Sequence, residues 1–143
     1  MNTKYTFWAK LSGFLQLLTS LVHSITFFMK PTAENETERQ LLDLFQNYKK
    51  DYGAGFVRST SQLVTGLSAC FTMMCLLGGL VLVYLLKKKV SAEIMEGILN
   101  IYLVVYGIYL IVTIVFTFLP PIIFIALVFL TLLIAKLKIA KRY

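Results

Sequence analysis

The chain has 143 residues, of which 58% are hydrophobic and only 15% are charged, with 14 Lys and Arg residues against 7 Asp and Glu residues. Charged residues make up about 25% of an ordinary globular domain, so this composition excludes a conventional soluble fold and indicates an integral membrane protein. The net charge of +7 does not indicate nucleic acid as a partner, because most basic residues lie at the ends of apolar runs, where they orient a chain in a membrane.

Four apolar runs are each long enough to cross a bilayer, since a hydrocarbon core about 30 Å thick needs about 20 apolar residues per helix. They predict transmembrane helices over residues 8–29, 59–86, 97–118 and 122–138. Prolines end the first run and separate the third from the fourth, because proline does not continue a helix well. The prediction is an all-α protein, with residues 1–143 forming a single integral membrane four-helix bundle.

The segment between the first two predicted spans has a different character. Residues 32–57 hold five of the seven acidic residues of the chain, and apolar residues recur there at steps of three and four. That spacing predicts an amphipathic helix over residues 36–52, lying on the membrane surface or capping the bundle. Gly53-Ala54-Gly55 then predicts a flexible turn into the second span.

Basic residues at the ends of the runs predict the orientation. Nine of the fourteen Lys and Arg residues fall on the side that carries both termini: Lys4, Lys10, Lys87, Lys88, Lys89, Lys136, Lys138, Lys141 and Arg142. The other side holds five basic and five acidic residues and therefore has no excess of either charge. Because Lys and Arg accumulate on the cytoplasmic side, we expect both termini in the cytoplasm and the 32–57 segment outside it.

Polar side chains on three of the spans are predicted to meet in the outer half of the bundle. They are His23 on the first span, Arg58, Gln62 and Thr65 at the start of the second, and Tyr109 and Thr113 near the end of the third. One interpretation is a ligand-binding pocket in which His23 is the acid or base and Arg58 binds an anion, since an ionisable residue inside a span is a functional candidate by default. The other interpretation is that these groups only hydrogen-bond the helices together.

Other kinds of site find little support in the sequence. Haem ligation would need a second ligand besides the one histidine, and Cys70, Cys75 and His23 are not grouped as a metal site requires. We therefore expect no cofactor and no metal. The predicted spans contain no Asp or Glu, which argues against proton pumps and cation channels.

Residues 11–86 contain several short motifs that occur together: Leu21-Val22-His23-Ser24, a charged outer segment with an amphipathic stretch, Arg58-Ser59, and Leu63-Val64-Thr65-Gly66-Leu67. In these features the chain resembles a family of uncharacterised small bacterial four-span membrane proteins. The resemblance implies a four-span topology and a bacterial inner-membrane location. It implies no activity, because none is assigned to that family.

Two functions remain open from the sequence. The favoured one is non-enzymatic: a subunit or lipid-binding module of a larger membrane assembly, with membrane lipids, other membrane proteins or further copies of the chain as partners. The alternative is a pocket protein or enzyme that acts on an outer-leaflet lipid or isoprenoid-like substrate through His23 and Arg58. The second requires the predicted pocket to exist, whereas the first does not.

Overall fold

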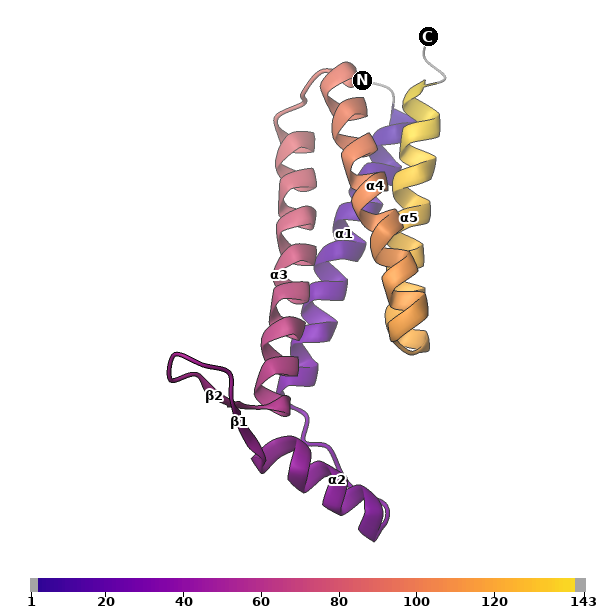
Figure 1. Ribbon diagram of the computed structural model, residues 1–143. Helices are drawn as coiled ribbons and strands as arrows, with labels where there is room; N and C mark the ends of the chain where they lie inside the picture. Colours follow the sequence, from indigo (N-terminus) through magenta and orange to yellow (C-terminus); the bar gives the residue numbers. More distant parts are fainter. Residues whose placement is uncertain (1–2, 141–143) are drawn as a thin grey trace. The chain divides into compact units, whose positions relative to one another are not determined.

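The computed structural model describes residues 3–140, with side chains from Tyr5 to Ile139. Within these residues, four helices are long and apolar enough to span a membrane, which confirms the predicted all-α membrane fold. Lys141, Arg142 and the side chain of Lys4, which entered the charge count, lie outside the described part. The elements in chain order are α1 (Thr3–Ile25), a 3-10 turn (Thr26–Phe28), α2 (Glu36–Asn47), β1 (Lys49–Asp51), β2 (Val57–Ser59), α3 (Thr60–Lys87), α4 (Ala92–Phe116) and α5 (Leu119–Ala140), as Figure 1 shows.

The chain divides into two compact units. Unit 1 comprises Met1–Thr19 with Cys75–Tyr143, and unit 2 comprises Ser20–Met74. Unit 1 therefore contains parts of α1 and α3 together with all of α4 and α5, whereas unit 2 contains the other parts of α1 and α3 with α2 and the two strands.

The core of unit 1 is formed by apolar side chains that recur along each helix at three- and four-residue steps. On α5 the fully buried residues are Ile125, Val128, Leu132, Ala135 and Ile139. Helix α4 packs against α5 and runs antiparallel beside it (Figure 1). This spacing places one continuous stripe of the helix against its neighbours and leaves the rest of its surface for lipid.

Helix α4 begins at Ala92, before the expected residue 97, because Ser91 caps it. The Ser91 hydroxyl oxygen accepts a hydrogen bond from the backbone N–H of Ile94. The predicted polar connection is therefore shorter, and Glu96 belongs to the helix. Glu96 forms an ion pair with Lys136 of α5, and both side chains are largely withdrawn from the surface.

Pro120 and Pro121 also occupy a different place from the one expected. They lie in the first turn of α5, which begins at Leu119, and not in the connection before a helix starting at residue 122. A proline is compatible with the first turn because the backbone N–H groups there have no partner within the helix.

In unit 2, helix α2 ends at Asn47 and not at the expected residue 52, because the chain enters a β-hairpin. Strands β1 and β2 pair antiparallel, with Lys50 opposite Arg58. Their turn contains three consecutive residues with positive φ, Gly53, Ala54 and Gly55. The Asp51 carboxylate accepts a hydrogen bond from the N–H of Gly53, which gives this turn a defined geometry.

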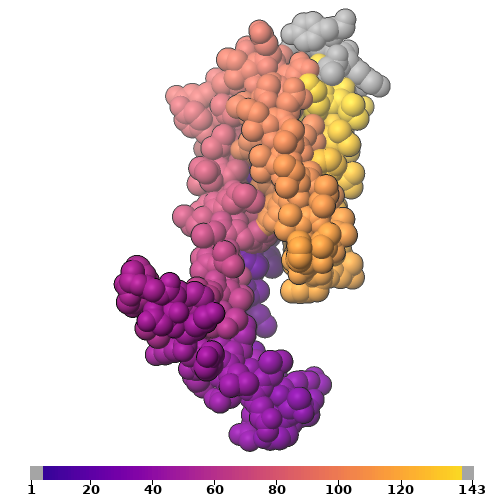
Figure 2. All heavy atoms as spheres, in the orientation of Figure 1, coloured from indigo at the N-terminus to yellow at the C-terminus, as the bar shows by residue number. Residues whose placement is uncertain are grey.

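The outward surface of α4 is apolar along almost its whole length and is in view in Figure 2. Ile101, Val104, Ile108, Ile111 and Val115 each have about 60% of their surface exposed, between 59% and 64%. Exposure of that extent suits a helix face that is solvated by acyl chains, where burying apolar surface against protein offers little gain.

Candidate functional site

The most completely buried polar cluster of the described residues lies in unit 1 and is centred on Gln16. The Gln16 side chain has no exposed surface. Its Oε1 accepts a hydrogen bond of 2.8 Å from the Tyr106 hydroxyl of α4, and its Nε2 donates one of 3.2 Å to the Ser12 hydroxyl. Both ends of the amide are thus satisfied, which a polar group in a hydrocarbon environment requires.

Two adjacent glycines of α3 make room for this cluster. A Cβ atom on Gly78 would lie 2.3 Å from Gln16 Oε1 and 3.1 Å from the Tyr106 hydroxyl oxygen. A Cβ atom on Gly79 would lie 2.8 Å from the Leu17 side chain. Only glycine at these positions allows α1 to approach α3 so closely, as small residues do in other transmembrane helix pairs.

Further groups of α3 and α4 extend the cluster. The Tyr102 hydroxyl donates a 2.7 Å hydrogen bond to the carbonyl oxygen of Gly78, and the buried Cys75 thiol contacts the Tyr106 hydroxyl. The Tyr102 and Tyr106 rings stack with centroids 6.1 Å apart. The cluster therefore joins α1, α3 and α4 through neutral donors and acceptors that bond one another, which is the arrangement of a helix-packing element.

His23 lies in unit 2, where its environment is aromatic. Its ring meets Phe71 edge to face at 4.6 Å between centroids and Phe27 at 5.7 Å. Its Nε2 is buried and has no hydrogen-bond partner among the residues that the structure describes. The surroundings are those of a packed ring, and between Tyr5 and Ile139 no carboxylate or hydroxyl hydrogen-bonds to this nitrogen to orient it for proton transfer.

Gln62 and its neighbour Ser59 form a capping box at the start of α3. The Gln62 Oε1 accepts a hydrogen bond from the Ser59 N–H at 3.0 Å, and the Ser59 hydroxyl accepts one from the Gln62 N–H at 3.3 Å. This reciprocal pair satisfies two donors that a helix N-terminus otherwise leaves free. Gln62, which the sequence predicts to bind a ligand, thus also stabilises the start of α3.

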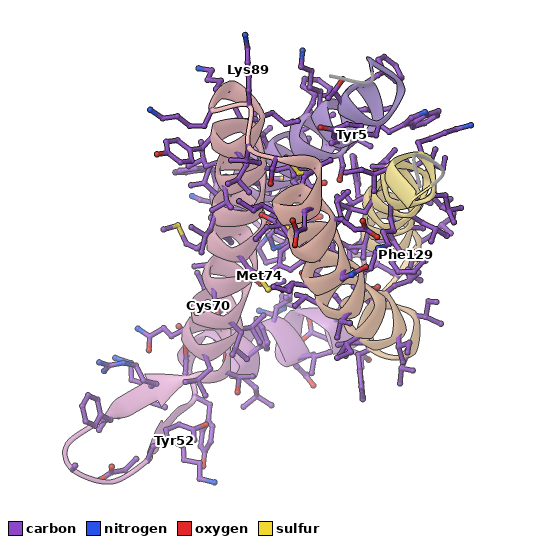
Figure 3. All side chains as sticks on the ribbon, turned by 90° about the horizontal axis from the view of Figure 1, so that it is seen from above. Tyr5, Tyr52, Cys70, Met74, Lys89 and Phe129 are labelled. Carbon is purple, nitrogen blue, oxygen red and sulfur yellow. The ribbon has the colours of Figure 1, made fainter. Side chains whose placement is uncertain are left out.

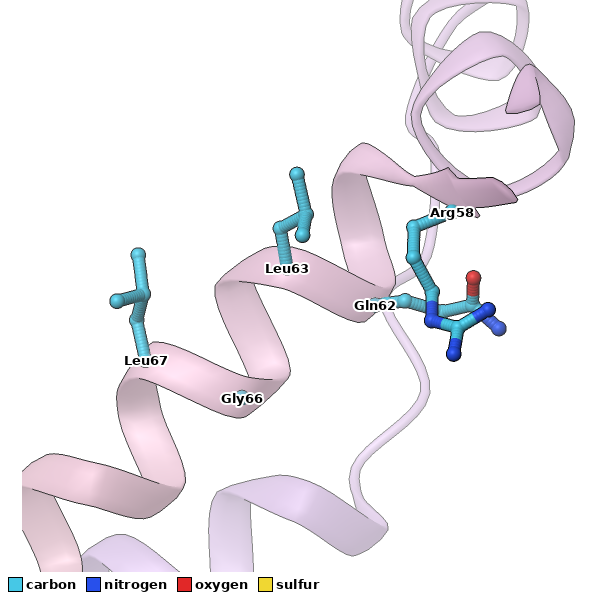
Figure 4. A pocket seen from close by; sticks show the side chains of 5 residues that line it. All are labelled: Arg58, Gln62, Leu63, Gly66 and Leu67. Carbon is cyan, nitrogen blue, oxygen red and sulfur yellow. The ribbon is translucent and has the colours of Figure 1, made fainter. Parts of the chain in front are cut away.

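Arg58 stands at the end of an exposed groove along α3. The groove has a volume of about 460 Å³ and is lined by Arg58, Gln62, Leu63, Gly66 and Leu67. Figure 4 shows the Arg58 and Gln62 side chains running beside each other, while Leu63 and Leu67 lie one turn apart along the helix. The Arg58 guanidinium donates to the carbonyl oxygen of Val57 and lies over the Phe56 ring at 5.8 Å.

The structure does not gather all six predicted residues into one unit. His23, Arg58, Gln62 and Thr65 belong to unit 2, and Thr65 is exposed without lining the groove. Tyr109 and Thr113 belong to unit 1. The buried Thr113 hydroxyl bonds to carbonyl oxygens of its own helix, as threonine does within transmembrane helices, and the Tyr109 ring packs 6.2 Å from that of Tyr106.

Outside the spans, the N-terminus of α2 carries a compact set of charges. The Asn35 side chain caps the helix by accepting from the Glu38 N–H, and the Glu38 carboxylate accepts from Asn35 Nδ2 in return. Arg39 donates two hydrogen bonds, of 2.8 and 2.6 Å, to the Glu36 carboxylate, which lowers the pKa of Glu36 from its ordinary value. Helix α2 buries none of its residues, so its apolar stripe, including Leu41 and Leu44, stays uncovered.

No family model, curated protein or solved structure matches the chain. The resemblance described for residues 11–86 therefore stays a prediction, and the assignment of a function depends on the geometry alone.

Proposed function

We propose that the chain is a non-enzymatic lipid-binding module of a larger membrane assembly, located in a bacterial inner membrane with both termini in the cytoplasm. The groove along α3 carries this proposal. It combines the Arg58 guanidinium group at the boundary of a span with apolar side chains further along that span. A phospholipid fits this arrangement, with its phosphate at the guanidinium group and an acyl chain along the apolar side chains.

The chemistry of the groove favours a phospholipid over a soluble ligand. Arginine binds a phosphate in a bidentate manner, with two parallel N–H donors. Lys50 is the residue opposite Arg58 in the hairpin, and its ammonium group lies over the Tyr52 ring, 5.6 Å from the centroid, so Arg58 is the cation that lines the groove. Along the helix Leu63 and Leu67 offer an apolar wall. Gly66 leaves space between the turns, since beyond its own helix backbone and chain neighbours no described atom lies within 4 Å of where its Cβ would be.

Helix α2 supports the same proposal from outside the span. Leu41 and Leu44 have 65% and 60% of their surface exposed on an otherwise polar helix. A short helix with one apolar stripe and charged neighbours lies stably at a membrane interface, with the stripe among the headgroups. His23 does not line the groove, so we assign it no catalytic role.

The experiment compares Arg58→Gln with Lys49→Gln in the full chain. Lys49 precedes Lys50 in β1 and, because successive side chains of a strand point to opposite faces, its substitution removes one charge on the other face of the hairpin. Native mass spectrometry of the purified protein counts the phospholipid molecules retained per chain. We expect Arg58→Gln to lose a retained phospholipid and Lys49→Gln to keep it.

Two results would count against the proposal. Equal retention by the two variants would mean that Arg58 holds no headgroup. Turnover of an added lipid by the wild-type chain, abolished in His23→Ala, would favour the enzymatic alternative instead. Reporter fusions at both termini test the orientation separately, and an external signal from either terminus would refute it.

A further inference from the structure

A second groove lies in unit 1, between α1 and the C-terminal end of α3. Its volume is about 440 Å³. One end of its lining is cationic and consists of Lys10, Lys87 and Lys89. The remainder is apolar and consists of Phe14, Leu17, Val83 and Leu86. It shares no residue with the groove at Arg58.

The helix spacing and two glycines together form this groove. On α1, Lys10, Phe14 and Leu17 follow one another at four- and three-residue steps and so lie on one face. Gly79 lets the two helices approach closely, because its missing side chain leaves room for Leu17 and the Gly13 carbonyl oxygen. The apolar part of the groove extends along α1 and α3 from this point of close approach to the three lysines.

The three lysines present uncompensated charge. Among the residues that the structure describes, no carboxylate forms an ion pair with any of them. Lys89 lies just beyond the end of α3 with a φ of +52°, a conformation that usually selects glycine. The Lys89 N–H bonds to the Leu86 carbonyl oxygen and the Val90 N–H to that of Leu85, which holds Lys89 at the end of the helix seen in Figure 3.

The neighbouring Lys88 has a different position. Its ammonium group lies over the Tyr84 ring, 5.7 Å from the centroid, and it does not line the groove. Lys88 thus provides a control with the same charge and the same sequence context as Lys87 and Lys89.

We propose that this groove binds an anionic phospholipid of the adjacent leaflet. The headgroup phosphate accepts hydrogen bonds from Lys10, Lys87 and Lys89, and one acyl chain lies against Phe14, Leu17 and Val83. The occupant follows from charge complementarity, because three ammonium groups with no carboxylate among the lining residues favour a lipid with a net negative charge over a zwitterionic one. Basic pockets between transmembrane helices bind anionic headgroups by the same chemistry.

The test uses the full chain, purified in detergent and equilibrated with equal amounts of phosphatidylglycerol and phosphatidylcholine. Native mass spectrometry gives the ratio of the two lipids retained on the protein. We expect phosphatidylglycerol to be enriched on the wild-type chain. A lysine near an anionic surface contributes about 1 kcal/mol, so Lys87→Gln should lower the enrichment about fivefold, and Lys10→Gln should do the same.

The Lys88→Gln control decides between a site and a diffuse charge. Enrichment retained in Lys88→Gln but lost in Lys87→Gln supports the groove. An equal loss in both, or no enrichment on the wild-type chain, overturns the proposal. The substitutions exchange exposed side chains, and an unchanged thermal unfolding temperature verifies that each variant is folded. Arg58→Gln should leave this enrichment intact, so the two lipid sites can fail independently.

Discussion

Replacing Gly78 with alanine tests the close packing of α1 against α3 directly. The new methyl group would lie 2.3 Å from Gln16 Oε1, closer than carbon and oxygen can stand, so the Gln16 amide has to move. The amide is fully buried, and moving it breaks its hydrogen bond to Tyr106. An interhelical hydrogen bond in a membrane contributes about 0.6 kcal/mol on average, and overpacking costs about 1–3 kcal/mol. Alanine has a better helix propensity than glycine, which offsets about 1 kcal/mol of this loss, so Gly78→Ala should lower the free energy of unfolding by about 0.5–2.5 kcal/mol.

Gly97→Ala is the matched control for this substitution. Gly97 also lies within a transmembrane helix, but beyond its own helix backbone and chain neighbours no described atom lies within 4 Å of where its Cβ would be. The free energy of unfolding is measured by titrating the purified protein from mild detergent into dodecyl sulfate and following the fluorescence of Trp8, the one tryptophan of the chain. We expect Gly97→Ala to be as stable as the wild type or slightly more so. If the two variants unfold alike, Gly78 does not provide the space for the Gln16 amide.

Three further predictions concern single side chains. Tyr106→Phe leaves Gln16 Oε1 without its donor and should lower the free energy of unfolding by about 1 kcal/mol in the same titration, and a wild-type value would contradict the bond. His23→Phe should keep or raise the unfolding temperature, because it replaces a buried nitrogen that has no hydrogen-bond partner among the described residues, and a marked loss of stability would indicate that the imidazole has a polar role. Arg39→Gln should raise the pKa of Glu36 toward its ordinary value in a carbon-13 NMR titration, since the Arg39 guanidinium lowers it. Because the pKa of Glu36 is lowered in the folded chain, the Glu36–Arg39 pair stabilises α2 at pH values above the ordinary pKa of glutamate. This stabilisation is lost as the pH falls through the pKa of the folded chain. An unshifted Glu36 pKa in the wild type would refute the pairing.

The four spans could be predicted from the sequence because the length of an apolar run directly reflects the thickness of a bilayer. Their ends could be predicted less well, since capping depends on single side chains. Ser91 extends α4 toward the N-terminus. In the first turn of α5 the backbone N–H groups have no acceptor within the helix, so Pro120, which lacks an N–H, is compatible with that turn. The β-hairpin was missed because its strands are three residues each, and Gly53-Ala54-Gly55 alone indicates a turn without a pairing register.

The candidate site could be predicted only in part. Arg58 and Gln62 do line one groove, because β2 ends one residue after Arg58 and Gln62 lies in the first turn of α3 that follows directly. The Gln16 cluster was missed, since pairing Gln16 with Tyr106 depends on which face of α1 meets α4. The adjacent Gly78 and Gly79 were the signal that could have located it, because consecutive glycines inside an apolar helix mark a place where another helix comes close.

The link between α4 and α5 has a consequence for how the chain is made. Only Thr117 and Phe118 separate the two helices, and neither carries a charge. When the translocon inserts this pair, no charged side chain of the link has to cross the lipid interior. The two helices and their uncharged link can therefore enter the bilayer together as one hairpin.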